Sequence, residues 1–378
     1  MVDMVEKSLA AVLEGHRNIK LREFPLPEIG SEEMIVKMEA LSLCGSDPKF
    51  YRGELDWYIG DRYPVIMGDE ILGRIYKVGE KTAKYWNVKE GDRVIVDAKI
   101  PCGKCNMCLS GMNWFLCKEG MTYGVMSCKD PPHLLGGMSE YLYVPPKGLV
   151  YKVPEEIPTE AAVICAVILG DALHWIETLG KTKLGDTVAI LGPGPQGLAS
   201  TLIAREAAGV SGTIIVAGYG PRDSKRLELA KKFGADYTID TQKETLLSRV
   251  EELTGGEGAE VVLETAGAVQ TITSMLDLVK PLGTAIHIAA TGGREYPFVP
   301  EKIWTKEMTL TGGLGHLPGS VERCLKYVQA VLKTGKTPIK EFISHKFPLE
   351  KAEEALRTMG MEIEGQYPVK VMIDFRGR

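Results

Sequence analysis

The 378-residue chain has no long hydrophobic run. Its longest apolar stretch, residues 161–170, is about half of the roughly 18 residues that a membrane-spanning helix needs. The first fourteen residues mix acids with apolar residues and carry no signal-peptide pattern. We therefore expect a cytoplasmic protein with no membrane partner, and the alternative is export by an unrecognised route.

The chain also has no excess of basic charge. Its 45 lysines and arginines stand against 50 acids, which gives a formal net charge of −5. Basic residues are not interleaved with aromatic ones, and aromatic residues make up only 7% of the chain. Such a surface offers no electrostatic reason to bind nucleic acid, so we expect no nucleic-acid partner.

Internal repeats and low-complexity linkers are absent as well. The 44% apolar and 25% charged residues are typical of a globular protein, and the length suggests two domains. Glycine is abundant: 42 residues are about 11% of the chain, against about 7% on average. This excess suggests many tight turns and close backbone approaches, as nucleotide-binding α/β folds require.

The pattern of short elements changes near residue 165. Before it, short apolar segments such as 34–40 and 92–97 are bounded by Gly and Pro, which predicts a mostly β domain. After it, strands alternate with helices, which predicts a parallel, doubly wound α/β sheet. The final stretch is helical and ends in a strand at 369–374.

A glycine-rich turn lies between a predicted strand at 187–191 and a predicted helix at 198–208. Its first glycine allows a tight turn, its second lets the backbone approach a pyrophosphate, and its third lets helix and strand pack closely. The helix N-terminus offers unpaired N–H groups to phosphates. In this context the turn predicts dinucleotide binding, and the alternative is a structural turn without a ligand. The expected cofactor-binding residues here are Gly192, Gly194, Pro195, Gln196 and Gly197.

The next strand should end in an acid that bonds the ribose of NAD, but Gly218 stands there. Arg222 follows closely and would suit the 2′-phosphate of NADP. Alternatively, Asp223 reaches back to the ribose, or these charges form a solvated helix start. The sequence thus predicts NAD or NADP and slightly favours NADP. His316 falls near the expected cofactor site, but nothing in the sequence assigns it a role.

Four cysteines crowd into sixteen residues, at positions Cys102, Cys105, Cys108 and Cys117. Four thiolates fill the tetrahedral shell of zinc and leave no position for water or substrate, so the pattern predicts a structural zinc site. An iron–sulfur cluster is the main competitor. A disulfide framework is disfavoured by the expected compartment.

In these motifs the chain resembles the zinc-dependent medium-chain dehydrogenase/reductase family, the alcohol and polyol dehydrogenases. The resemblance covers nearly the whole chain and rests on residues 43–47, 67–73, 165–170, the four-cysteine loop and the glycine-rich turn. It implies a GroES-like catalytic domain at 1–165, to which 316–378 return, and a Rossmann domain at 166–315. It also implies a homodimer or homotetramer.

The resemblance further implies a catalytic zinc. Carried over by position, Cys44 and Cys165 would be ligands, Ser46 would relay the alcohol proton, and Glu70 would be a carboxylate able to approach the metal. The match at Cys165 is less certain, because a buried free thiol is a common fate of a cysteine in an apolar run.

One expected ligand departs from the family pattern, because Asp69 stands where the family has histidine. Zinc accepts carboxylate oxygen, but the site would carry one more negative charge. Asp47 and Asp69 would then face each other without a donor and would need a shared proton, a rotation or a cation. Lys49 is the expected cation and the expected end of the proton relay. The alternative is that this site has lost its zinc.

The leading functional interpretation is an enzyme that moves a hydride between a nicotinamide and a secondary alcohol or ketone. Polar and aromatic residues between 51 and 61 favour a polyol, sugar derivative or other hydroxylated substrate, unless they serve loop packing. One alternative is a related reductase of an activated alkene or quinone without catalytic zinc. Another is an inactive homologue with a nucleotide-sensing or structural role.

Overall fold

The computed structural model describes residues 6–377, which form two compact units. Unit 1 holds the described residues up to 167 together with 321–330 and 342–377, and unit 2 holds 168–320 and 331–341. The sequence predicts domain boundaries at residues 165 and 315, and the two units divide after residues 167 and 320. Residues 331–341, expected with the first domain, group with unit 2, where Lys232 Nζ lies 2.8 Å from Glu341 Oε2.

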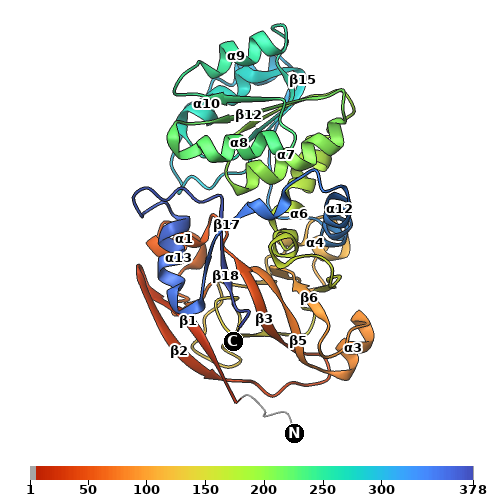
Figure 1. Cartoon of the computed structure of the whole chain (residues 1–378), viewed down its shortest axis with the longest axis vertical. Helices are drawn as coiled ribbons and strands as arrows, with labels where there is room; N and C mark the ends of the chain where they lie inside the picture. The colour runs from red at the N-terminus through yellow and green to blue at the C-terminus, as the bar shows by residue number, and fades with distance from the viewer. Residues whose placement is uncertain (1–5, 378) are drawn as a thin grey trace. The chain divides into compact units, whose positions relative to one another are not determined.

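A seven-stranded sheet runs through unit 1 in the order β10-β6-β5-β3-β18-β17, and β9 also pairs with β3 (Figure 1). Its neighbours are antiparallel except for β17 and β18. The strands are β3 (Met34–Ser42), β5 (Glu70–Val78), β6 (Arg93–Val96), β9 (Tyr141–Val144), β10 (Val150–Lys152), β17 (Ile343–Phe347) and β18 (Lys370–Asp374). Two smaller sheets contain β1 (Lys7–Gly15), β2 (Asn18–Pro25) and β4 (Val65–Ile66), and β7 (Lys99–Ile100) and β8 (Met121–Thr122). This is the mostly β domain that the segment pattern predicts.

Short helices fill the connections of unit 1. They are α1 (Asp47–Arg52), α2 (Asp56–Ile59), α3 (Glu80–Trp86), α4 (Asn106–Leu109), α5 (Thr159–Ala162) and α13 (Ala352–Met359), with 3₁₀ turns η1 (Trp114–Leu116), η2 (Val163–Cys165) and η6 (Leu349–Lys351). Helix α1 packs against α13, where the Tyr51 hydroxyl donates to Glu353 Oε1 at 2.5 Å. The long α12 (Ser320–Thr334) has residues in both units, and η5 (Ile339–Phe342) follows it.

Unit 2 is built on a six-stranded sheet in the order β13-β12-β11-β14-β15-β16, and every pair in it is parallel. Its strands are β11 (Thr187–Leu191), β12 (Thr213–Gly218), β13 (Tyr237–Asp240), β14 (Ala259–Glu264), β15 (Val279–His287) and β16 (Thr309–Gly312). Its helices are α6 (Ile168–Leu173), the π-helix η3 (His174–Leu179), α7 (Pro195–Ala208), η4 (Pro221–Asp223), α8 (Ser224–Lys232), α9 (Leu246–Leu253), α10 (Val269–Leu278) and α11 (Glu301–Trp304). The unit thus has the predicted Rossmann architecture.

The glycine turn between β11 and α7 needs its glycines for steric reasons. Gly192 has φ of 109°, a conformation that disfavours other residues. A Cβ on Gly197 would lie 1.9 Å from Gly192 O, so a side chain there would push the helix off the strand. A Cβ on Gly194 would meet nothing within 4 Å, so open space lies beside the helix N-terminus.

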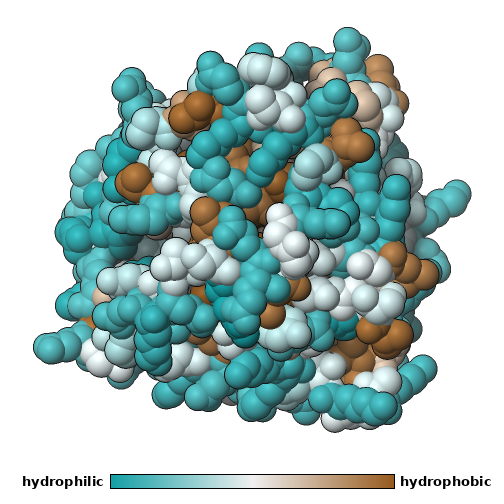
Figure 2. Space-filling model, turned by 90° about the horizontal axis from the view of Figure 1, so that it is seen from above, coloured by the Kyte–Doolittle hydropathy of each residue, from teal (hydrophilic) through white to brown (hydrophobic). Residues whose placement is uncertain are grey.

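The molecular face in Figure 2 is mostly hydrophilic, with small separate apolar areas rather than one large patch. Such scattered apolar residues are ordinary on a protein surface. Within residues 6–377 no single helix is long and apolar enough to cross a membrane; the consecutive helical segments Thr159–Cys165 and Ile168–Leu179 meet that test only as a bent pair.

Candidate active site and cofactor site

The four-cysteine loop of unit 1 gathers its sulfur atoms around one point. The Sγ atoms of Cys102, Cys105, Cys108 and Cys117 all lie within 4.8 Å of one another. Backbone N–H groups of Lys104 and Cys105 point at Cys102 Sγ, at 3.5 and 3.3 Å. None of the chain's eight cysteines forms a disulfide. Four convergent thiols with N–H donors match the donor set of a tetrahedral zinc ion.

A second group of ionisable residues surrounds Cys44, at the start of α1. The Asp47 carboxylate accepts the Cys44 N–H at 2.7 Å, and Asp47 is 3% exposed. Burial raises the pKa of Asp47 to about 7, against the lowering effect of that N–H. Burial and then the charges of Asp69 and Glu70 raise the pKa of Cys44 above its ordinary value. The site is therefore crowded with groups that are negative when ionised.

The cation that balances this group is Lys370, which comes from β18. Its ammonium donates to Glu70 Oε1 at 2.8 Å and to Leu43 O at 2.9 Å, while Ser42 donates to the other oxygen of Glu70. Both side chains of the Glu70–Lys370 pair are fully buried. Sequence reasoning named Lys49 as the cation, which stays a proposal, and did not name Lys370. The sequence signal that could have identified Lys370 is its place inside the predicted apolar strand at 369–374.

Cys165 comes from a separate element, η2, which packs against β3 and β5. It ends η2, is fully buried, and its thiol lies 3.5 Å from Ala161 O in the preceding helical turn. Burial alone raises the pKa of Cys165, with no contribution from the charges around Cys44. Across residues 6–377 the four-cysteine loop is the one group that gathers ligand atoms within 4.8 Å. The ligand atoms of Cys44, Asp69 and Cys165 do not all lie within 4.8 Å of one another, and their role as zinc ligands stays a proposal.

Ser46 and Lys49 lie where the sequence places them, on α1. Ser46 is the N-cap residue of that helix, and its hydroxyl makes no capping hydrogen bond. Lys49 is partly buried on the same helix. Both residues therefore lie within a few positions of Cys44 along the chain.

A pocket of about 730 Å³ opens in unit 2 beside the ends of β11, β12 and β14. Gly192, Gly218 and Arg222 are among its lining residues. Parallel α/β sheets bind nucleotides at this position, outside the carboxyl ends of the strands. The pocket and the open space at Gly194 therefore have the place and shape that an adenine dinucleotide requires.

The pocket is lined by charges of both signs, Arg222 and Lys243 together with Asp223 and Glu244. Asp223 is 4% exposed, and its two oxygens accept from the Tyr219 N–H at 2.9 Å and from Arg226 at 3.1 Å. Each oxygen of this carboxylate thus already accepts one hydrogen bond within unit 2. Arg222 Nε lies 3.8 Å from Asp223 Oδ2, and about half of the Arg222 side chain is exposed at the pocket.

A buried polar cluster next to the glycine turn is absent from the sequence interpretation. Gln196 Nε2 donates to Asp171 Oδ2 at 3.0 Å, and His316 Nδ1 lies 3.5 Å from Asp171 Oδ1. Buried polar atoms without a hydrogen-bond partner among the described residues concentrate here, on Asp171, Gln196, Trp175 and Ser200. Buried unpartnered groups are costly, so this cluster is a place where a ligand or water supplies bonds. The sequence analysis singled out Gln196, through its place in the turn, and assigned no role to His316.

Comparison with known proteins agrees with this two-unit architecture. Residues 30–155 match the family model described as alcohol dehydrogenase GroES-like domain, and residues 195–330 match the one described as zinc-binding dehydrogenase. A probable alcohol dehydrogenase of Mycobacterium tuberculosis is 34% identical over 364 residues, which cover 95% of this chain and 96% of the relative. A sorbitol dehydrogenase of Bacillus subtilis is 30% identical over 351 residues, 92% of each chain.

Among solved structures, a zinc-binding dehydrogenase from Sinorhizobium meliloti bound to NADP superposes with a TM-score of 0.82. It is 28% identical, and the match covers 97% of this chain and 99% of that one. The predicted fold class, a GroES-like domain with a Rossmann domain, is confirmed. The chain belongs to the zinc-dependent medium-chain dehydrogenase/reductase family and is an NAD(P)-dependent oxidoreductase of CH–OH groups.

Proposed function

We propose that the protein oxidises a secondary alcohol of a polyol or sugar derivative, or reduces the corresponding ketone, with NADP as the preferred cofactor. The observation that carries the proposal is the glycine turn at the start of α7, set in an all-parallel sheet beside a nucleotide-sized pocket. The sorbitol dehydrogenase relative supports a hydroxylated substrate. The half-exposed guanidinium of Arg222 at the pocket supports NADP.

The residues between 51 and 61 support this substrate class only in part. Tyr51 and Asp56 are engaged inside unit 1, since Tyr51 binds Glu353 and Asp56 binds His16 and Tyr63. These two residues serve packing. Tyr58, by contrast, lines a pocket and is available to a ligand.

For the zinc, we propose the four-cysteine loop as the binding site. A zinc ion held there would tie the loop together and, with its shell filled by thiolates, supply no reaction step. The expected second site, Cys44, Asp69, Glu70 and Cys165, stays a proposal, and we derive no step through a second metal because its ligand atoms are not gathered within 4.8 Å of one another. The role of Ser46 in passing the alcohol proton stays a proposal.

The other expectations concern the assembled protein. We propose a homodimer or homotetramer in the cytoplasm, where eight free thiols would persist. Light scattering of the purified protein gives the mass of the assembly, and a monomeric mass would contradict this part.

Turnover of hydroxylated compounds is the direct test of the proposed function. Polyols, sugar alcohols, hydroxy acids and cyclic alcohols are incubated with NAD and NADP separately, and formation of the reduced nicotinamide is followed by its absorbance. We expect turnover of a polyol or sugar derivative, faster with NADP. Turnover of simple alkanols alone would overturn the substrate class, and no turnover with either cofactor would overturn the function.

A further inference from the structure

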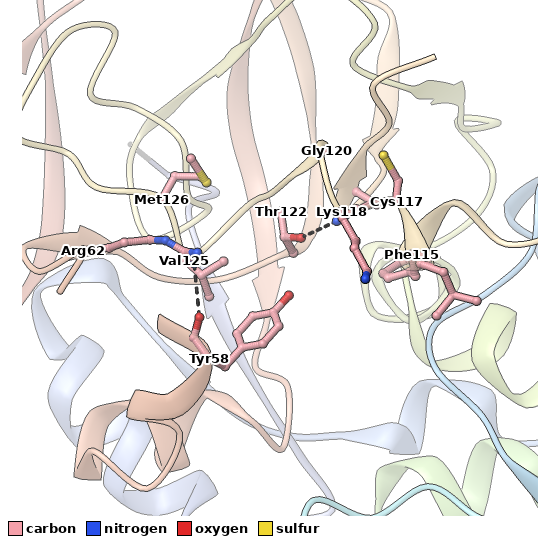
Figure 3. Close-up of a pocket in the computed structure, with 11 residues that line it drawn as sticks. Tyr58, Arg62, Phe115, Cys117, Lys118, Gly120, Thr122, Val125 and Met126 are labelled. Carbon is pink, nitrogen blue, oxygen red and sulfur yellow. Dashed lines mark hydrogen bonds between the residues drawn. The ribbon is translucent and has the colours of Figure 1, made fainter. Parts of the chain in front are cut away.

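Unit 1 contains a pocket of about 430 Å³ that is lined by three cations and by Cys117, one of the four proposed zinc ligands. Arg62, Lys99 and Lys118 line it together with Tyr58 and Phe115, and no Asp or Glu is among the lining residues. Figure 3 shows Arg62 on one side, Lys118 and Phe115 on the other, and Tyr58 between them. In a chain with a net charge of −5, this local excess of positive charge is unusual.

These three cations are not neutralised by carboxylates. Arg62 donates to the carbonyl oxygen of Tyr58 at 3.2 Å, and Lys99 donates to the Thr122 hydroxyl at 3.3 Å. Among the ion pairs of residues 6–377, none involves Arg62, Lys99 or Lys118. Lys104, in the four-cysteine loop, differs from these three cations because its Nζ lies 3.0 Å from Glu119 Oε2.

Part of the positive charge of this pocket lies close to the thiols of the four-cysteine loop. Lys99 is 6% exposed, its pKa is lowered by burial, and the charges of Cys117 and Cys108 act in the opposite direction. Lys99 therefore offsets the negative charge of the cysteine loop. Arg62 and Lys118 are exposed at the pocket and remain for a ligand.

The other lining groups suit a hydroxylated carbon skeleton. Tyr58 and Thr122 bring hydroxyls, and Phe115 and Val125 bring apolar surface. A pocket of this volume lies in the range that small organic ligands occupy. The mixture indicates an occupant with an anionic end and a short polyhydroxylated chain.

The pocket adjoins the segment that carries Asp69. Its wall residue Val125 follows Gly124, and a Cβ on Gly124 would lie 2.8 Å from the backbone nitrogen of Gly68. The pocket wall and the Gly68–Asp69 segment are thus in direct backbone contact within unit 1.

We propose that this pocket binds the phosphate of a phosphorylated polyol or sugar, which makes a phosphate monoester the substrate class. The inference rests on the proposed function. A phosphate monoester carries about −1.5 to −2 charges at neutral pH, which matches the two available cations. Arg62 offers a planar fork of donors, the geometry that suits phosphate oxygens, and Lys118 offers a mobile point charge.

The test separates binding from turnover. Inorganic phosphate is titrated into the full-length, zinc-loaded protein by calorimetry, and kcat/KM is measured for a polyol and its phosphate ester. Arg62→Ala and Lys118→Ala are compared with Lys104→Ala, a matched control whose side chain does not line the pocket. Zinc content is measured for every variant.

We expect saturable phosphate binding that each pocket variant weakens by about ten-fold, which corresponds to about 1.4 kcal/mol. The preference for the phosphate ester over the free polyol should fall by a similar factor, and Lys104→Ala should change neither. Phosphate binding without turnover would support the pocket and contradict the proposed function.

Four results would overturn the proposal. They are no saturable phosphate binding, equal binding in all variants, a stronger preference for a carboxylate analogue than for the phosphate ester, and loss of zinc as the only effect of Lys118→Ala. The last result would mean that Lys118 serves the thiolates rather than a ligand.

Discussion

Replacing Lys370 by methionine should destabilise unit 1 strongly. Lys370 and Glu70 are 1% and 0% exposed, and their charged atoms are 2.8 Å apart. Methionine retains the length of the lysine stem but carries no charge. The substitution therefore leaves the Glu70 carboxylate buried beside Asp47 and without the charge of Lys370.

The size of the effect follows from this burial. Removing one partner of a buried ion pair costs about 3–5 kcal/mol, because the remaining charge is left in a medium that solvates it poorly. In a domain of roughly 200 residues each kcal/mol lowers the melting temperature by about 2–4 °C. Lys370→Met should thus lower the Tm of unit 1 by about 6–20 °C.

Differential scanning calorimetry of Lys370→Met, Glu70→Gln and the double variant measures this. The double variant should recover at least half of the loss, because both charges are gone. Lys20→Met, on the exposed face of β2, is the control and should change stability by less than about 0.5 kcal/mol. A Tm shift below about 2 °C for Lys370→Met, or strict additivity in the double variant, would refute the reasoning.

Four further predictions follow from the two units. Cys105→Ser should release the zinc of the four-cysteine loop, whereas Cys165→Ser should retain that zinc, as measured by elemental analysis, because Cys165 does not belong to the four-cysteine group. Arg222→Ala should raise the KM for NADP by roughly ten- to hundred-fold, the value of a charged hydrogen bond of about 1.5–3 kcal/mol, and leave the KM for NAD little changed. Gly197→Ala should lower cofactor affinity in a fluorescence titration by more than about ten-fold, because its Cβ would lie 1.9 Å from a backbone oxygen. Glu160→Gln should flatten the loss of stability on acidification in thermal melts between pH about 4.5 and 2, because Lys346 and Arg376 overcome the effect of burial and lower the pKa of Glu160 to about 2.

The sign of the acid effect follows from the direction of the shift. A carboxylate whose folded pKa lies below its usual value of 4.5 stabilises the fold above that pH, and this contribution disappears as the pH falls towards 2. An equal loss of stability on acidification in Glu160→Gln and in the unaltered protein would contradict the lowered pKa of Glu160. Zinc loss from Cys165→Ser would show instead that this thiol reaches a metal, and equal changes in the KM for NAD and NADP would remove the phosphate role of Arg222.

Features carried by one short segment were predictable. The spacing of Cys102, Cys105 and Cys108 predicts a convergent cluster because a loop of a few residues cannot place its thiols far apart. The glycine turn was predictable for a similar reason, since Gly192 and Gly197 each avoid a steric clash within their own strand–turn–helix segment. The alternation of strands and helices after residue 165 predicted the parallel sheet.

Features that join distant segments were decided only by the tertiary structure. Glu70 and Lys370 are 300 residues apart, and nothing local in either segment indicates their pairing. The direction of the Cys165 thiol and the occupied oxygens of Asp223 likewise depend on packing and hydrogen bonds that no spacing encodes. Sequence alone thus determined the family, the two-domain plan, the zinc loop and the dinucleotide turn. The fold decided which charges meet, because charge partners in a buried site are chosen by the strand register and loop paths that bring them within a few ångströms.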